Sequence, residues 1–255
     1  MDNNHILINL EDIHFSYPGR KPLLQGVYFQ LRAGERIGLT GPNGSGKTTL
    51  FHVIMGLLKP TSGNMEILGK RMKSEKDFRT VRQEIGLLFQ DPDDQLFTPT
   101  ALEDVAFGPL NQGKSIPEAK RIARETLSFL GLSDFEERVT YKLSGGEKRL
   151  VSLATVLAMK PKVLLLDEPT MGLDSDTTKM MVHILKQSEL AHVFISHDMD
   201  FIMQTTDKVY GMIDGQIVLE EEMIPHAHAH VHGFGRLPHS HSHVTELPPD
   251  SKKNI

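Results

Sequence analysis

Alternating apolar and polar side chains mark the start of the chain. Residues 6–15 (ILINLEDIHF) and 27–31 (VYFQL) follow a period of two, and Pro18 and Gly19 lie between these runs. This period is typical of strands that bury one face, and a proline–glycine pair favours a turn. We therefore expect two antiparallel strands joined near Pro18 and Gly19.

Largely apolar runs further along the chain predict buried strands, and the continuous aliphatic run at 163–166 is typical of a strand covered on both faces, as in a parallel sheet. The runs occupy residues 84–89, 163–166 and 191–195. From about residue 100 to 156 the apolar positions instead follow a helical period. We expect an α/β fold that combines an antiparallel β subdomain with a helical subdomain inserted at 100–156.

A glycine-rich loop follows a strand-like run at residues 35–40 and precedes a helix-like run that starts at Thr49. A phosphate-binding loop requires this setting, because loop N–H groups and a helix N-terminus must converge on one anion. Glycines let the backbone approach phosphate oxygens, Lys47 would contact the β- and γ-phosphates, and Thr48 would bind Mg²⁺. A chance match is rare, so the loop predicts nucleotide binding. The expected contacts are Gly41, Pro42, Asn43, Gly44, Ser45, Gly46, Lys47, Thr48 and Thr49.

Polar side chains follow the three apolar runs at their carboxyl ends, where ligands collect in an open α/β sheet. We expect Gln90 and Asp167 to join Thr48 around Mg²⁺. Glu168 is expected to act as general base toward the attacking water, and His197 to hydrogen-bond phosphate or water. Strand-end carboxylates and lone histidines are often structural, but a phosphate loop in the same chain favours the catalytic interpretation.

Two features are ambiguous when taken alone. Tyr17 lies near the first predicted turn, where its ring could stack on a purine base or simply belong to the loop. Ser144, Gly145 and Gly146 follow Leu143 at the start of a predicted helix, and serine and glycine are also good N-caps with no further role. Without other motifs, the ordinary helix cap is the favoured interpretation.

The order of these motifs resembles the nucleotide-binding subunits of ATP-binding cassette (ABC) transporters over residues 6–220. The matching motifs are an aromatic A-loop at Tyr17, a Walker A loop at 41–48, a Q-loop at Gln90, a signature at 143–146, a Walker B strand at 163–167, a catalytic base at Glu168, a D-loop through Asp174 and an H-switch at His197. The resemblance implies a P-loop NTPase with a mixed-sheet core that hydrolyses ATP with Mg²⁺. It also favours nucleotide contacts for Tyr17 and Ser144. Glu147 is a departure, since glutamine is frequent there.

In that family two cassettes pack head to tail, which implies a homodimer or a pair with a second cassette. Ser144, Gly145 and Gly146 of one protomer would then face the γ-phosphate held by Lys47 of the other. An anion is stabilised at a helix N-terminus because free N–H groups and the helix dipole both point at it.

A finer resemblance lies in residues 89–97 (FQDPDDQLF) and 103–109 (EDVAFGP), which are similar to the energy-coupling-factor (ECF) branch of vitamin and metal importers. It implies that the region after the Q-loop docks on an integral membrane scaffold subunit, while a separate membrane subunit binds the substrate. The protein is then expected at the cytoplasmic face of the cell membrane, as a peripheral subunit.

The composition changes after Pro225, so we expect an ATP-binding domain at 1–224, ending in a hairpin at Asp214 and Gly215, and a flexible tail at 225–255. The tail histidines are His226, His228, His230, His232, His239, His241 and His243. Imidazoles at alternate positions of an extended backbone can jointly bind a transition metal. A solubilising tail and an expression tag are the alternatives. Together with the importer resemblance, the tail favours cobalt or nickel over a vitamin as the transported substrate.

Composition and motifs weigh against other functions. The formal net charge is −5, which gives no general attraction to nucleic acid, and there is no cysteine to form a disulfide. A soluble ABC ATPase acting on ribosomes or DNA would usually carry two cassettes or a long coiled coil, and the sequence has neither. No Asn-Lys-x-Asp motif supports a GTPase. Glu168 and His197 argue against a nucleotide-switched metal store.

Overall fold

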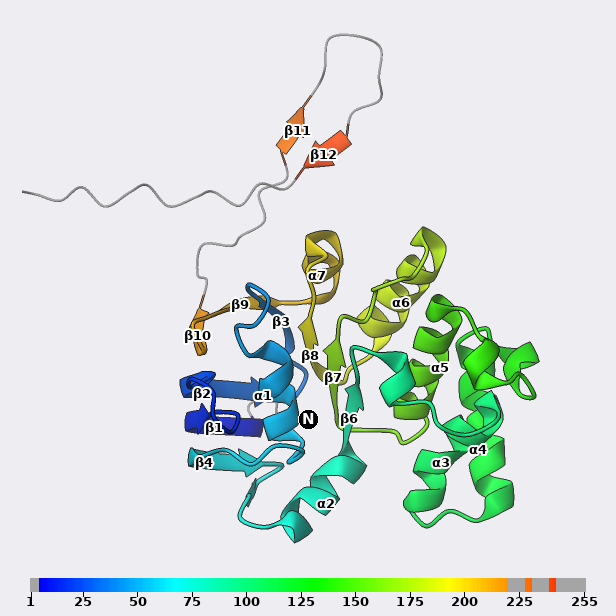
Figure 1. Ribbon diagram of the computed structural model, residues 1–255. Coiled ribbons are helices and arrows are strands. Elements are labelled where there is room, and N and C mark those ends of the chain that lie inside the picture. Colours follow the sequence, from blue (N-terminus) through cyan, green and yellow to red (C-terminus); the bar gives the residue numbers. More distant parts are fainter. Residues whose placement is uncertain (1–4, 220–227, 231–238, 242–255) are drawn as a thin grey trace, which may run out of the picture. The chain divides into compact units, whose positions relative to one another are not determined.

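The computed structural model describes residues 5–219, 228–230 and 239–241 (Figure 1). The chain divides into two units, Met1–Leu219 and Glu220–Ile255. The first unit holds an antiparallel sheet, a mixed sheet and the helices around them. None of the described helices is long and apolar enough to cross a membrane.

The antiparallel sheet confirms the alternating pattern at the start of the chain. In spatial order its strands are β2 (Leu24–Arg32), β1 (Ile6–Phe15), β4 (Ser62–Ile67) and β5 (Lys70–Arg71). Leu10 pairs with Phe29, and both are buried, whereas Asn9 pairs with Gln30 on the polar face. The period of two therefore separates the core from solvent, as expected for a half-buried sheet.

The mixed sheet combines parallel strands with one antiparallel edge. Its strands, in spatial order, are β10 (Gln216–Leu219), β9 (Lys208–Ile213), β3 (Arg36–Thr40), β8 (Ala191–Ile195), β7 (Val163–Asp167) and β6 (Ile85–Leu88). β9 and β10 form the predicted hairpin, and its turn residues Asp214 and Gly215 have φ of 46° and 75°. Positive φ at both positions suits a tight two-residue hairpin turn.

The mixed sheet separates two hydrophobic cores, which explains why its central strands read as continuous apolar runs. On β7, Val163 and Leu165 pack into the core shared with the antiparallel sheet and α1 (Lys47–Ile54). Leu164 and Leu166 face the other core, to which the helices that follow β6 contribute. Successive strand side chains point to opposite faces, so each β7 residue is needed by one core or the other.

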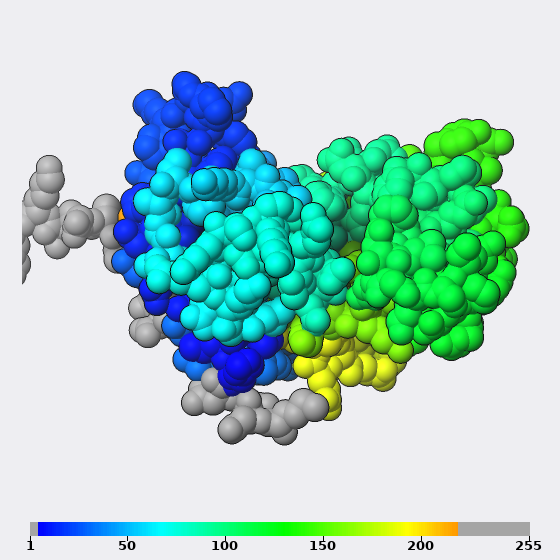
Figure 2. Space-filling view, turned by 90° about the horizontal axis from the view of Figure 1, so that it is seen from below, coloured from blue at the N-terminus to red at the C-terminus, as the bar shows by residue number. Residues whose placement is uncertain are grey.

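The helical subdomain lies against the second face of the mixed sheet. The helices after α1 are α2 (Glu75–Glu84), α3 (Ala101–Asn111), α4 (Ile116–Phe129), α5 (Gly145–Leu157), α6 (Ser175–Gln187) and α7 (Met199–Thr205). α3, α4 and α5 contact one another and form the inserted subdomain. Figure 2 shows α2 (cyan) between the antiparallel sheet (blue) and this subdomain (green) on one face of the molecule.

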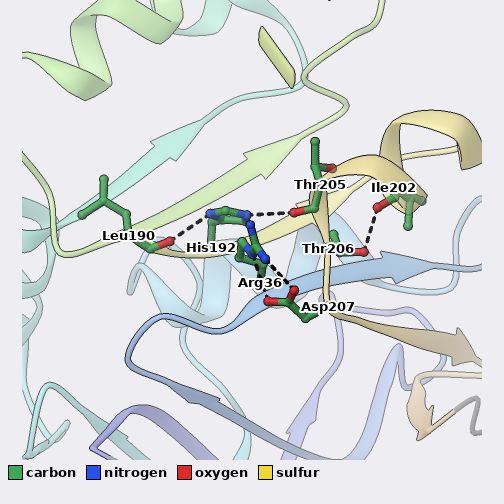
Figure 3. A network of polar contacts seen from close by, with 7 residues as sticks. All are labelled: Arg36, Leu190, His192, Ile202, Thr205, Thr206 and Asp207. Carbon is green, nitrogen blue, oxygen red and sulfur yellow. Dashed lines mark hydrogen bonds and ion pairs between the residues drawn. The ribbon is translucent and has the colours of Figure 1, made fainter. Parts of the chain in front are cut away.

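A polar network ties together the amino ends of three strands of the mixed sheet (Figure 3). Arg36 on β3 holds Asp207 through two hydrogen bonds, of 2.9 Å from Nε and 2.6 Å from Nη2. His192 on β8 is fully buried and contacts the carbonyl oxygens of Leu190 and Thr205 at 2.9 and 3.3 Å. Burial lowers the pKa of His192, and the Arg36 guanidinium lowers the pKa of Asp207. These contacts stabilise the end of the sheet opposite the predicted site.

The second unit contains two short strands, β11 (His228–His230) and β12 (His239–His241). They pair antiparallel, with His228 opposite His241 and His230 opposite His239 in the backbone register. The other tail histidines, His226, His232 and His243, lie outside the described residues. Within the described residues, no cluster of three or more histidine or acidic side chains gathers where it could hold a metal ion.

Candidate nucleotide-binding and catalytic site

The glycine-rich loop lies between β3 and α1, where the sequence predicts it. Gly41 has φ of 135°, and a Cβ on it would come within 2.3 Å of the Met212 carbonyl oxygen. Gly46 has φ of 110° and caps α1, and a Cβ there would come within 2.8 Å of the Leu24 side chain. Both positions therefore require glycine. Because α1 has no side-chain cap at Gly46, the N–H groups of its first turn point into the loop.

Buried polar groups inside the loop suit an anion. Lys47 is only 7% exposed, and its Nζ donates to the carbonyl oxygens of Gly41 at 2.7 Å and Pro42 at 3.1 Å. Desolvation lowers the pKa of Lys47, while the charges of Glu168 and Asp167 oppose that shift. Ser45 Oγ is buried without a hydrogen-bond partner among the described residues. A phosphate would give these groups partners, so the loop fits a nucleotide.

Thr48 and Asp167 bring two oxygen ligands together across the site. Thr48 Oγ1 donates to Asp167 Oδ2 at 2.7 Å, which joins the start of α1 to the carboxyl end of β7. Asp167 is 2% exposed; desolvation raises its pKa, and the hydrogen bond from Thr48 partly offsets that rise. Hard oxygen ligands of this kind fit Mg²⁺. Gln90 lies two residues beyond the end of β6 at the same edge of the sheet.

Glu168 and His197 meet at the carboxyl ends of β7 and β8. His197 Nε2 lies 3.5 Å from Glu168 Oε1 and 3.2 Å from Asn43 Oδ1, so it links the candidate base to the phosphate loop. Glu168 has φ of 47°, and its N–H donates to the Ile195 carbonyl oxygen at 2.8 Å. A strained backbone at a site residue is typical of a functional constraint. Burial raises the pKa of Glu168, while the neighbouring His197 lowers it.

Tyr17 lies against the first turn of α1. Its hydroxyl is 3.4 Å from Thr49 Oγ1, and its ring meets Phe15 edge to face at 4.9 Å. Tyr17 is therefore held beside the phosphate loop although it is distant in sequence. This position fits the predicted contact with the nucleotide base.

The signature residues form the N-terminus of α5. Ser144 Oγ accepts from the Glu147 N–H, and Glu147 Oε2 accepts from the Ser144 N–H, which completes a capping box. Arg138 Nη1 donates to the other Glu147 oxygen at 3.0 Å. Hydrogen bonding with Ser144, the backbone N–H first, is the main reason that the pKa of Glu147 is lowered. Within the described residues, no hydrogen bond or ion pair joins Ser144, Gly145 or Gly146 to the phosphate loop.

One buried residue of this region was not expected from the sequence. Arg149 on α5 is 1% exposed, and its Nη1 donates to the Phe89 carbonyl oxygen at 2.6 Å. Its Nη2 donates to the Gln90 carbonyl oxygen. One signal for its burial is present in the sequence, because Arg149 stands immediately before a mostly apolar stretch that begins at Leu150.

Comparisons with known proteins agree with this geometry. The family model "ABC transporter" matches residues 24–171, more than half of the chain. The energy-coupling factor transporter ATP-binding protein EcfA of Methanothermobacter thermautotrophicus is 42% identical over 218 residues, covering 84% of this chain and 70% of EcfA. The structure of CbiO1 from Clostridium perfringens, described as part of the ABC transporter complex CbiONQ, has a TM-score of 0.74 at 34% identity and covers 85% of this chain and 88% of CbiO1. The cassette MJ0796, solved as a dimer with ADP and phosphate, has a TM-score of 0.77 at 28% identity and covers 84% of this chain and 97% of its own.

Proposed function

The chain belongs to the ABC transporter family, as an ATP-hydrolysing cassette of ECF type, and from this premise we propose that it works as a head-to-tail dimer that energises a membrane importer. The observation that carries the proposal is the separation of the signature residues from the phosphate loop within one chain. Among the described residues, no hydrogen bond or ion pair joins Ser144 to Lys47, although each belongs to a group suited to phosphate. A second copy would bring the two halves together.

Each half of the proposed site has a distinct task. Lys47 and the loop N–H groups hold the triphosphate, and Tyr17 contacts the base. Thr48, Asp167 and Gln90 would hold Mg²⁺, which neutralises charge on the β- and γ-phosphates when bound. Glu168 polarises the attacking water, and His197 steadies it or the γ-phosphate by hydrogen bonding. The partner's signature helix adds N–H groups at the γ-phosphate.

Complementation between inactive variants tests the dimer directly. Ser144→Arg disables the signature side of a site, and Lys47→Ala disables the phosphate-loop side. Each variant alone should be inactive, but a 1:1 mixture forms some dimers with one intact composite site. If chains pair at random and the sites act independently, ATPase activity should return to about one quarter of the wild-type rate.

The matched control combines two variants that are defective on the same side. Lys47→Ala and Glu168→Gln both affect the phosphate-loop side, so no pairing creates an intact site, and their mixture should stay inactive. Equal recovery in both mixtures, or no recovery in the first, would contradict the head-to-tail arrangement.

An exposed aromatic pair after the Q-loop supports the proposed docking on a membrane scaffold subunit. Phe97 is 66% exposed, and its ring meets Phe107 edge to face at 4.7 Å. Buried Asp104 fixes this geometry, because its Oδ1 accepts from the N–H groups of Phe97 and Thr98 at 3.1 Å each. Exposed apolar side chains that are held in place are typical of interaction surfaces. The cassette would thus sit at the cytoplasmic face of the membrane.

A substitution on this surface should separate docking from hydrolysis. Phe97→Ser is expected to lower the fraction of protein that sediments with membranes when it is co-produced with its membrane subunits. Ile116→Ser removes an equally exposed apolar side chain, 64% exposed, from the helical subdomain and serves as the control. Equal membrane association of both variants would exclude Phe97 from the interface.

For the transported substrate we propose cobalt or nickel, with a vitamin as the alternative. Support comes from the tail, whose alternating histidines His228, His230, His239 and His241 pair in the backbone register of β11 and β12. Neutral imidazoles bind these ions, so metal binding by the tail should weaken below about pH 6, where the imidazoles become protonated. Calorimetry with Ni²⁺ and Co²⁺ on the intact chain and on a chain lacking residues 225–255 tests this role. Equal metal uptake by both chains would remove the tail from it.

A further inference from the structure

Arg149 is the largest fully buried side chain of the described core, and the functions proposed above leave it without a task. Within the described residues no carboxylate lies within ion-pair distance of its guanidinium. Instead the Nη1 and Nη2 atoms donate to the carbonyl oxygens of Phe89 and Gln90, and Nε has no hydrogen-bond partner in the described part of the chain. Burying a cation without a carboxylate partner is costly, so this position is expected to serve more than packing.

The contacts of Arg149 join two functional segments of one protomer. Arg149 belongs to α5, whose first residues carry the signature, whereas Phe89 and Gln90 form the Q-loop at the end of β6. Desolvation lowers the pKa of Arg149, and the charges of Asp167, Asp91 and Glu168 oppose that shift; Asp167 and Glu168 belong to the proposed catalytic site. The guanidinium therefore lies between the signature helix and the carboxylate edge of the sheet.

Two flanking contacts hold the same segments together. Lys148 Nζ pairs with Asp93 Oδ1 at 2.5 Å, one residue before Arg149 on α5. Gln95 Nε2 donates to the Ser152 carbonyl oxygen at 2.9 Å and to Thr155 Oγ1 at 2.7 Å. The Gln95 side-chain oxygen also accepts from the Phe89 N–H at 3.1 Å. About two turns of α5, from Lys148 to Thr155, thus contact the Q-loop segment, and Arg149 makes the contact that reaches Gln90 itself.

We propose that Arg149 is a positioning residue that makes the Q-loop and the signature helix one rigid unit. The position of Gln90 at its own nucleotide then fixes the position of Ser144 at the partner's nucleotide. The guanidinium suits this task because its planar fork holds two carbonyl groups in fixed directions, which a single ammonium group does not do. This inference rests on the proposed head-to-tail dimer.

The test compares Arg149→Lys and Arg149→Met with Arg124→Gln. Arg124 also lies in the helical subdomain, but it pairs with Glu136 on the surface and does not touch the Q-loop. For each variant, equilibrium ATP affinity, kcat, the Mg²⁺ concentration that half-saturates hydrolysis, and the melting temperature are measured. ATP-dependent dimerisation is measured separately in the Glu168→Gln background.

With Arg149→Lys, ATP affinity should stay within about twofold of wild type, because Lys47 and its loop are unchanged. kcat should fall by about tenfold or more, since small displacements of positioned groups have effects of this size. The Mg²⁺ requirement should rise and ATP-dependent dimerisation should weaken. Arg149→Met should exceed Arg149→Lys in each effect, and Arg124→Gln should match wild type.

The proposal is overturned if kcat, Mg²⁺ dependence and dimerisation of Arg149→Lys match those of Arg124→Gln. It is also overturned if ATP affinity falls in parallel with kcat, because that pattern indicates general damage to the fold. If Arg149→Met does not fold, the comparison of Arg149→Lys with Arg124→Gln still decides. Failure of the dimer proposal would be seen separately, because a mixture of Ser144→Arg and Lys47→Ala, each with Arg149 intact, would then recover no ATPase activity.

Discussion

Replacing Glu168 by glutamine removes a charge from the site while it preserves size and hydrogen-bonding capacity. The side chain is 13% exposed and lies 3.5 Å from His197 Nε2, so an amide can occupy the same position. Burial raises the pKa of Glu168, which makes its carboxylate a stronger base than that of a free glutamate. A general base contributes about 10²- to 10⁴-fold to a rate. We expect the middle of that range, about 10³-fold, which corresponds to about 4 kcal/mol in the activation free energy.

Single-turnover hydrolysis with enzyme in excess over ATP measures this step without product release. Nucleotide affinity should change little, because Lys47 and Thr48 are untouched. Size-exclusion chromatography should show an ATP-bound dimer that accumulates, since association continues while hydrolysis does not. Glu189→Gln makes the same chemical change at an exposed residue between α6 and β8 and should behave as wild type. Turnover of Glu168→Gln within about threefold of wild type would refute its role as the base.

Three further predictions concern pH, the cap of α5 and the core. Because the pKa of Glu168 is raised in the folded protein, kcat should fall as pH drops through a value above 4.5, the ordinary pKa of glutamate, and Glu168→Gln should lack this acid limb in a pH–rate profile. Arg138→Gln should weaken ATP-dependent dimerisation by less than about fivefold, because the contact between Arg138 and Glu147 is partly exposed. Adding Glu147→Gln should restore dimerisation, and sedimentation equilibrium that shows no restoration would contradict this electrostatic account. Leu165→Ala should lower the free energy of unfolding by about 3 kcal/mol, because Leu165 is fully buried. A denaturant titration that shows a decrease of less than about 1 kcal/mol would contradict the two-sided burial of β7.

The sequence predicted those parts of the fold in which a local pattern matches the final environment. β7 and β8 are buried on both faces, so all their residues except Asp167 and His192 are apolar and the strands were readily located. The hairpin at Asp214 was predicted because its turn requires positive φ. α2 was missed because only Phe78 and Val81 among its residues are apolar, too few to mark a helical period, and α7 was missed because it spans only seven residues.

The site residues could be predicted from the order and spacing of the motifs. The contacts between motifs could not be predicted in this way. The sequence placed Glu168 and His197 at neighbouring strand ends, and the structure brings them within 3.5 Å. It gave no indication that Asn43 would contact His197, because that pairing depends on how β3 and β8 align in the sheet. Arg149 was missed for the same reason, since an arginine in an amphipathic helix is ordinarily expected at the surface.

The polar groups of the phosphate loop also explain how the site can be preformed and still bind an anion. Lys47 Nζ already donates to two loop carbonyls, and Thr48 Oγ1 already donates to Asp167. ATP with Mg²⁺ therefore exchanges one set of partners for another, so the gain in free energy is the difference between the two sets. The ammonium group of Lys47 has three donors, so it can turn toward phosphate at little cost. Asp167 lacks this freedom because it is buried, and a metal ion beside Thr48 would supply the countercharge that its carboxylate needs. On this argument nucleotide affinity should depend on Mg²⁺ far more strongly in the wild type than in Asp167→Asn, and equal Mg²⁺ dependence in an equilibrium binding titration would contradict it.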